Sequence, residues 1–164
     1  MSNPVFIIGG GESLRGFDFS LLDGHATIGT NASAYFYPSD YLFVQDNGFL
    51  KSHDLSFFKG EIVRPSANQP FGNAGFGAIL HAIKLGFSPI YLLGFDMQCK
   101  EFTHFHDKYS HELESRRESA SKQLELFNKH ADIFKGHEIY SIGNTALNLF
   151  PNLNLEDVFQ TTEN

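Results

Sequence analysis

Near its start the chain reads Val5-Phe6-Ile7-Ile8-Gly9-Gly10-Gly11-Glu12-Ser13-Leu14. Four consecutive apolar residues are typical of a strand buried on both faces, as in a parallel sheet. Glycines directly after such a strand allow a sharp turn and leave backbone N–H groups free to face an anion. Open α/β sheets bind nucleotides at the carboxyl end of the first strand. The run therefore predicts a nucleotide-binding α/β domain, with Gly9, Gly10, Gly11 and Ser13 at the ligand.

The rest of the chain alternates short apolar runs with helical patterns. This alternation indicates βαβ units and a Rossmann-like, mainly parallel sheet flanked by helices. The length of 164 residues fits a single domain, which we assign to residues 1–159, followed by a frayed tail at 160–164. We expect strands at Val5–Ile8, Ala26–Thr30, Tyr41–Gln45, Glu61–Val63, Pro89–Leu93 and Glu138–Ile142. Apolar spacing predicts helices over Ala74–Leu85 and His111–Phe134, each followed by a glycine.

Charge and cysteine content narrow the class of protein. Lys and Arg number 12 against 19 Asp and Glu, a net charge of −7, so no nucleic-acid partner is expected. The single cysteine, Cys99, excludes an internal disulfide framework and suits a reducing compartment. We see no leader pattern and no apolar run of membrane length, and therefore expect a cytoplasmic protein without a membrane partner. The expected partner is a small-molecule nucleotide ligand, and a homo-oligomer is left open.

The glycine turn matches neither of two common phosphate-binding motifs. A dinucleotide fingerprint needs a third glycine where this chain has Leu14, and an acidic residue where the second strand ends at Asn31. The Gly-Lys-Ser/Thr of a phosphate loop is absent. NAD binding by the usual scheme is therefore disfavoured. A tight turn with no ligand is the remaining alternative.

Polar residues follow several of the expected strands. Asn31 comes after the second strand, Asp46 after the third and Asp96 after the fifth. Because the carboxyl ends of parallel strands share one edge, these side chains should meet there with Ser13. An Asn amide both donates and accepts hydrogen bonds, so it can read a base edge or a ribose. For Asn31, Asp46 and also Asn73, capping of a following helix is the alternative.

An irregular segment rich in histidine lies between the fifth strand and the second long helix. It carries His104 and His106, and His111 follows at the helix start. Since histidine titrates near neutral pH, one of these side chains could deprotonate a hydroxyl acceptor, and all three are candidate catalytic residues. An exposed polar loop is the plain alternative. Zinc binding has less support than either interpretation, because no Cys pair or further ligand set accompanies the histidines. We therefore assign no metal.

Three other residues are weaker candidates. Cys99 has no base beside it in the sequence, and we interpret it as an inert thiol. Arg116 and Arg117 could supply charge that faces a phosphate, but both fall beside the apolar stripe of the second helix, which favours solvent-facing roles.

The order of these motifs resembles a known family. Residues 9–22, Gly-Gly-Gly-Glu-Ser-Leu-Arg-Gly-Phe-Asp-Phe-Ser-Leu-Leu, look like the opening of the bacterial sialyltransferases of glycosyltransferase family 42. There a Gly-x-Gly-Pro-Ser-Leu turn leads into an Asp-aromatic-Ser-x-Leu segment. Thr30-Asn31 is similar to the family's Cys-Asn, and residues 73–96 resemble its Ser-Gly helix and Leu-Gly-Tyr-x-x-Ile-Tyr-Leu-x-Gly-Ile-Asp strand. Phe150-Pro151-Asn152 then follows in the same order.

The wider clan includes the motility-accessory-factor proteins and the archaeal pterin diphosphokinases of the MptE type. The chain looks closest to small phage-encoded proteins with a Gly-Gly-Gly-Pro-Ser-Leu start and a Thr-His-aromatic-His loop. Glu12 replaces the proline of that start, and it would bring the wrong charge to a phosphate unless it faces away. Of the family's lid tyrosines, Tyr109 is the one plausible equivalent in this much shorter chain.

The resemblance implies a Rossmann-like fold that binds a nucleotide sugar, CMP-linked in that family, without a metal. It implies nucleotide contacts from Gly10, Gly11, Ser13 and Asn31, a position near the sugar for Asp46, and a phosphate-side helix start at Asn73, Ala74 and Gly75. It also implies a general base after Asp96, with His111 or His106 as the best match. We expect a small sialyltransferase-like glycosyltransferase. The alternatives are a non-catalytic nucleotide-binding phage accessory protein and an MptE-like diphosphate transferase.

Overall fold

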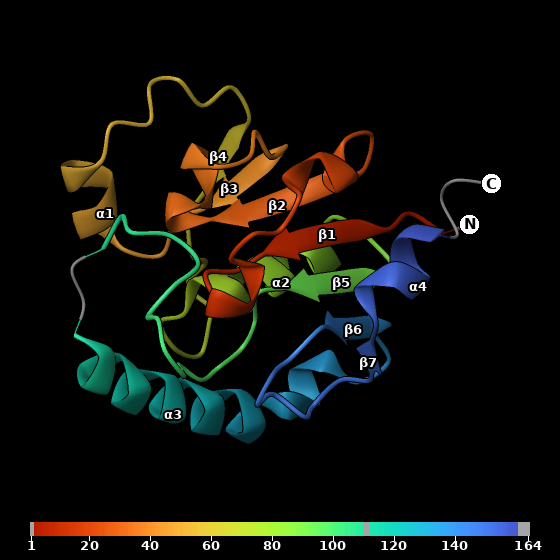
Figure 1. Ribbon diagram of the computed structural model, residues 1–164. Helices are drawn as coiled ribbons and strands as arrows, with labels where there is room; N and C mark the ends of the chain where they lie inside the picture. The colour runs from red at the N-terminus through yellow and green to blue at the C-terminus, as the bar shows by residue number, and fades with distance from the viewer. Residues whose placement is uncertain (1, 110–111, 161–164) are drawn as a thin grey trace.

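The computed structural model describes residues 2–109 and 112–160 and contains a seven-stranded sheet of order β4-β3-β2-β1-β5-β6-β7 (Figure 1). Every neighbouring pair of these strands is parallel. The strands are β1 (Val5–Ile8), β2 (Ala26–Thr30), β3 (Tyr41–Phe43), β4 (Glu61–Val63), β5 (Ile90–Leu93), β6 (Ile139–Ile142) and β7 (Asn152–Leu153). Helices flank the sheet, so the predicted Rossmann-like α/β fold is confirmed.

The central strand β1 is buried on both faces, as its four apolar residues predict. Val5 and Ile7 pack into a core with Phe76 and Phe127, which belong to α2 (Ala74–Lys84) and α3 (Leu113–Lys129). Its other two side chains face a second core, which lies on the opposite side of the sheet. That side is covered by the short helices η1 (Glu12–Leu14) and η2 (Phe19–Leu22) and by α4 (Leu155–Gln160), as the view in Figure 1 shows for α4.

Several strands are shorter than the apolar runs predict. β3 ends at Phe43 rather than at Gln45, although Val44 N still donates to Val63 O over 2.9 Å. β5 begins at Ile90 rather than at Pro89, since proline has no N–H to donate to a neighbouring strand. β6 begins at Ile139 rather than at Glu138.

The two long helices also end earlier than predicted. α2 stops at Lys84, and Leu85 is its C-cap. The predicted helix over His111–Phe134 is α3 followed by the short 3-10 helix η4 (Ala131–Phe134). The break falls at His130, whose φ of −105° and ψ of 22° are not helical. α3 begins at Leu113, and its N-cap Glu112 has an extended backbone; residue 111, where the helix is predicted to begin, lies outside the described residues.

Besides η1 and η2, four short elements were not expected from the sequence. These are η3 (Asn31–Tyr35), α1 (Asn47–Ser52), β7 and α4. The link from β1 to β2 also differs from a standard βαβ unit, because the described chain there forms only η1 and η2 and no α-helix. Of the predicted frayed tail, Gln160 ends α4 and the remaining residues lie outside the described part. Within that part, no helix combines the length and apolarity needed to cross a membrane.

The chain reverses its direction across the sheet at β1. β2, β3 and β4 extend to one side of β1, and β5, β6 and β7 extend to the other. In such sheets ligands bind in the crevice outside the carboxyl ends of the strands at this switch point. We therefore expect a ligand site at the loops that follow β1 and β5.

Candidate functional site

A cavity of about 330 Å³ opens at the carboxyl ends of the strands, and we call it the central cavity. Loops after β1, β2, β3 and β5, the start of α2 and one side of α3 line it. Among the predicted site residues it is lined by Gly9, Gly10, Gly11, Asn31, Asp46, Asn73, Ala74, Gly75, Asp96, His104 and His106. Ser13 is not part of this lining, and the predicted base His111 lies outside the described residues.

The sequence predicts free backbone N–H groups in the glycine turn, but two of these groups have hydrogen-bond partners. Gly9 N donates to Leu93 O over 2.7 Å, and Gly11 N donates to Gly94 O over 2.8 Å. The expected anion-binding role is therefore wrong for these two N–H groups, because the carbonyls that follow β5 occupy them. The sequence shows the turn, but it cannot show a partner more than 80 positions away.

Close packing explains the glycines instead. A Cβ atom on Gly9 would lie 2.7 Å from Gly94 O, and one on Gly11 would lie 2.5 Å from Asp96 Oδ1. A Cβ atom on Gly10 would lie 3.1 Å from His104 Cδ2, within the cavity wall. The three glycines thus allow the loops after β1 and β5 to touch, and allow a histidine to lie against the turn.

Ser13 and Asp96 bind each other. Asp96 is only 5% exposed; its Oδ2 accepts from Ser13 N over 2.8 Å and its Oδ1 from Ser13 Oγ over 2.5 Å. Burial raises the pKa of Asp96 above its usual value, and the two hydrogen bonds from Ser13 oppose this rise. The pair ties the glycine turn to the loop after β5, so it holds the cavity wall in place.

Glu12 does not line the central cavity. Its carboxylate accepts hydrogen bonds from the backbone N–H groups of Lys100, Glu101 and Phe102. Burial alone would raise the pKa of Glu12, but these three donors outweigh it and the pKa is lowered. The acidic residue in place of proline therefore holds the loop after β5 instead of approaching a ligand.

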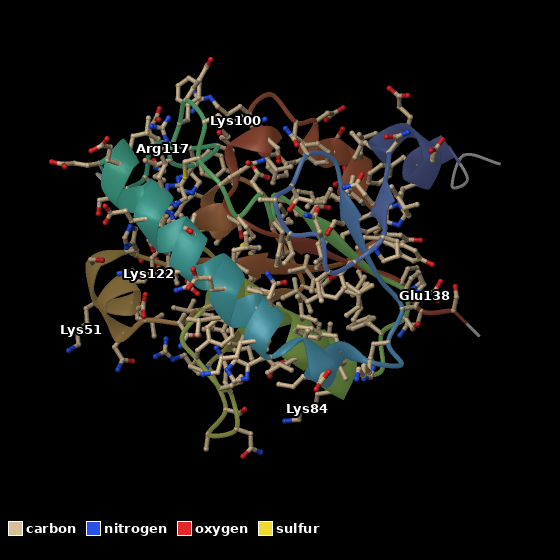
Figure 2. The ribbon with its side chains drawn as sticks, turned by 90° about the horizontal axis from the view of Figure 1, so that it is seen from below. Lys51, Lys84, Lys100, Arg117, Lys122 and Glu138 are labelled. Atoms are coloured by element: carbon tan, nitrogen blue, oxygen red, sulfur yellow. The ribbon has the colours of Figure 1, made fainter. Side chains whose placement is uncertain are left out.

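Two arginines hold the same loop from outside. Arg117 donates to the carbonyl oxygens of Cys99 and Lys100, and Figure 2 shows it beside Lys100 at the amino-terminal end of α3. The Arg15 guanidinium lies 3.6 Å from the centre of the Phe102 ring. The expected solvent exposure of Arg117 is confirmed, and its hydrogen bonds fasten the loop to α3.

The histidine loop places a stack of rings against the cavity. His104 and His106 are each 6% exposed, and their ring centres are 5.2 Å apart with the planes at 21°. Tyr109 meets both rings edge-on, at 4.8 and 5.0 Å, and its hydroxyl accepts from Ala32 N over 3.2 Å. Tyr109, the tyrosine that the sequence suggests as a lid equivalent, thus lines the cavity and links this loop to the chain after β2.

His106 is a neutral side chain at physiological pH. Burial, with a smaller effect from Lys108, lowers the pKa of His106 to about 4. Lys108 N donates to its Nδ1 over 3.2 Å, so the neutral ring carries its proton on Nε2. A base works best when its pKa lies near the working pH, and this value therefore suits His106 as a hydrogen-bond donor better than as a general base.

Helix capping was the alternative to ligand binding for Asn31, Asp46 and Asn73. The structure shows a capping side chain at one of these three residues. Asn73 Oδ1 accepts from Phe76 N over 2.8 Å, so Asn73 caps α2. Asp46 precedes α1 but makes no capping hydrogen bond with its side chain. Asn31 has a left-handed backbone with a φ of 46°, and its buried Oδ1 has no hydrogen-bond partner among the described residues. Asp46 and Asn31 therefore line the cavity without a capping role.

One side of α3 supplies cavity residues, of which the sequence analysis considered only Arg116. Arg116, Ser119 and Gln123 line the central cavity, so the solvent-facing role expected for Arg116 is wrong. Its Nη1 donates to Ser119 Oγ over 3.3 Å, and Gln123 Oε1 accepts from Asn73 Nδ2 over 3.0 Å. The signal was present as polar residues spaced by three and four beside the apolar stripe, a spacing that puts them on one helix face.

A second cavity of about 320 Å³ adjoins the first, and we call it the side cavity. Phe49, Ser52 and His53 of the α1 region line only this cavity. The two cavities share five lining residues: Asn31, Asp46, His104, Tyr109 and Arg116. These shared residues form the junction between the two spaces.

The described residues of the site form neither a metal-binding group nor a reactive thiol. Within residues 2–109 and 112–160, no group of three or more His, Cys, Asp or Glu side chains is placed to hold a metal ion. Cys99 lines the central cavity, and burial raises the pKa of its thiol. A thiol with a raised pKa is a weak nucleophile at neutral pH, in agreement with the interpretation of Cys99 as inert.

Comparison of the chain with protein-family models, with curated proteins and with solved structures finds no match.

Proposed function

We propose that the protein binds a nucleotide or nucleotide sugar in the central cavity. The observation that carries this proposal is convergence: every residue predicted to contact the ligand, except Ser13, lines the same cavity at the switch point of the sheet. These residues come from segments as far apart in the sequence as Gly9 and Asp96. A tight turn without a ligand would not require the polar ends of β2, β3 and β5 to meet around an open space.

The chemistry of the lining fits such a ligand. Asn31 offers a buried acceptor atom for a base or ribose donor. The start of α2 at Asn73, Ala74 and Gly75 faces the cavity, and N–H groups in the first turn of a helix lack partners within the helix and favour an anion. The volume of about 330 Å³ lies at the lower end of the range for small-molecule sites.

The activity we propose is transfer of the glycosyl group of a nucleotide sugar, CMP-linked in the family that the sequence resembles. A histidine removes the proton of an acceptor hydroxyl as its oxygen forms a bond to the anomeric carbon. The bond from that carbon to the phosphate oxygen breaks, and the nucleotide leaves with the electron pair. His104, which lies against Gly10 in the cavity wall, is the described histidine best placed for this step.

A non-catalytic nucleotide-binding module is the second candidate. The observation that favours it is the low pKa of His106, about 4, which removes one of the three candidate bases from effective use near pH 7. This candidate predicts ligand binding without turnover.

Isothermal titration calorimetry with CMP, CMP-N-acetylneuraminate, UDP-glucose and GDP-mannose tests binding. We expect one nucleotide series to bind, and Asn31→Ala to weaken it, while Asn128→Ala on the exposed side of α3 leaves it unchanged. Absence of binding in all series at millimolar ligand would contradict the proposal. Release of free nucleotide from the bound nucleotide sugar in the presence of hydroxyl acceptors, lost in His104→Gln with binding retained, separates the transferase from the binding module.

A further inference from the structure

Arg116 is a half-buried cationic side chain. Its Nε atom is buried and has no hydrogen-bond partner, and no carboxylate forms an ion pair with it in the described part of the chain. No other Arg or Lys lines either cavity there. A guanidinium donor left without an acceptor costs free energy, so this position is built for an anion that the chain itself does not supply. The feature is notable in a chain with a net charge of −7.

The location of Arg116 indicates which part of a ligand carries the anionic group. Arg116 belongs to the set of residues that line both cavities, together with Asn31 and Asp46. An anion at Arg116 is therefore at the junction and not at the closed end of either space. A ligand with its charge at the junction has room for one group in the central cavity and another in the side cavity.

We infer that Arg116 binds the phosphate of a ligand that spans both cavities, a nucleotide whose phosphate carries a second organic group. The inference rests on the proposed function, which places the nucleoside in the central cavity. Arginine suits this role because its planar fork of N–H donors matches the oxygens of a phosphate. The assignment takes up the phosphate-facing alternative for Arg116 and replaces the solvent-facing role that the sequence favours.

Asp46 favours a phosphate that is substituted on both sides. Its exposed carboxylate lines both cavities beside the junction. A terminal phosphate carries a charge of about −1.5 to −2 at pH 7, whereas a phosphate esterified on both sides carries a single negative charge. Repulsion from Asp46 therefore penalises a free nucleoside monophosphate more than a nucleotide sugar.

The side cavity offers the surface for the second group. Phe49 and His53 stack with ring centres 4.2 Å apart and planes at 18°. Ser52 Oγ lies 2.9 Å from His53 Nδ1, so a hydroxyl and an imidazole edge adjoin this apolar surface. A ring that carries hydroxyl groups, such as a sugar, matches both the flat surface and the polar edge.

The test compares cytidine, CMP and CMP-N-acetylneuraminate by calorimetry, with uridine, UMP and UDP-glucose as a second series. Arg116→Gln should weaken binding of the phosphate-bearing ligands about tenfold or more, the effect of losing a hydrogen bond to a charged group, and leave binding of the nucleoside unchanged. Lys122→Gln is the matched control, since Lys122 is an exposed cation further along the same helix (Figure 2). It should leave every affinity unchanged.

A second variant tests whether the ligand occupies both cavities. His53→Ala should weaken binding of CMP-N-acetylneuraminate or UDP-glucose and leave CMP or UMP binding as it is. Equal losses for nucleoside and nucleotide in Arg116→Gln, no loss at all, or tighter binding of the monophosphate than of the nucleotide sugar would overturn the inference while the proposed function stands. Failure of every compound to bind the wild-type protein would overturn both. Thermal unfolding of each variant verifies that it is folded.

Discussion

Replacing Gly11 by alanine should destabilise the fold through close contacts of the new Cβ with Asp96 and Gly94. The backbone at Gly11 has a φ of −65° and a ψ of 149°, which any residue adopts, so the substitution introduces no backbone strain. The new Cβ would lie 2.5 Å from Asp96 Oδ1 and 2.6 Å from Gly94 O. Both atoms must move by about 1 Å to reach an ordinary contact distance.

The change in the free energy of unfolding follows from the contacts that the new Cβ displaces. Overpacking costs about 1–3 kcal/mol, and displacement of Asp96 weakens hydrogen bonds to a charged group that contribute about 1.5–3 kcal/mol. The lower chain entropy of alanine in the unfolded state offsets about 0.4–1 kcal/mol. The free energy of unfolding should therefore fall by about 2–4 kcal/mol, which at a urea dependence near 2 kcal/mol per molar lowers the unfolding midpoint by about 1–2 M.

The matched control is Gly48→Ala in α1. No atom lies within 4 Å of a Cβ built on Gly48, and the position is helical. This variant should gain about 0.4–1 kcal/mol, so the same chemical change has the opposite sign at the two sites. Equilibrium urea unfolding followed by circular dichroism measures both. A Gly11→Ala protein as stable as Gly48→Ala would refute the close packing of the turn against Asp96.

The remaining predictions concern the loop, the histidines and the caps. Because the folded pKa of Glu12 is lowered by backbone donors against the effect of burial, the tether it provides is present above the ordinary value of 4.5 and is lost as the pH falls through the lower folded value. Hydrogen-exchange protection of the amides of residues 100–102 should follow this course, and in Glu12→Gln it should already be lost at pH 6; persistence there would contradict the tether. Because burial lowers the pKa of His106 from 6.5 to about 4, the unfolded chain binds its proton first, and acidification between these values should lower the urea midpoint. His106→Gln should show a smaller difference between pH 7.5 and pH 5, and an unchanged difference would exclude His106 as its source. Asn73→Ala should cost about 1 kcal/mol because it removes a cap, whereas Asp46→Ala, which removes none, should stay within about 0.5 kcal/mol of wild type; equal losses would argue against this difference.

The sequence predicts the fold well because its main signals are local. Val5–Ile8 is apolar throughout because β1 is buried on both faces, and the spacing of apolar residues in α2 and α3 reflects one buried side of each helix. The two-residue strand β7 and the short helix α1 carry too few residues to show a period. Their form depends on the neighbours they pair with.

The candidate site was predictable where the topology alone positions a residue. Asn31, Asp46 and Asp96 follow strands, and parallel strands bring such positions to one edge. The use of the glycine amides was not predictable, because Gly9 and Gly11 are paired with carbonyls beyond β5. Nor was the low pKa of His106, since it depends on burial among rings from several segments.

The 3-10 crossover from β1 to β2 has a consequence for the direction in which a ligand lies. Dinucleotide-binding domains place the pyrophosphate at the start of the α-helix that follows the first strand. Here that strand is followed by a three-residue 3-10 turn, and the positive elements at the cavity are the start of α2 and Arg116 of α3. The glycine turn therefore contributes shape, and α2 and α3 contribute positive charge. We expect an uncharged ring of the ligand to rest on the turn with its phosphate pointing to α3, the reverse of the dinucleotide arrangement.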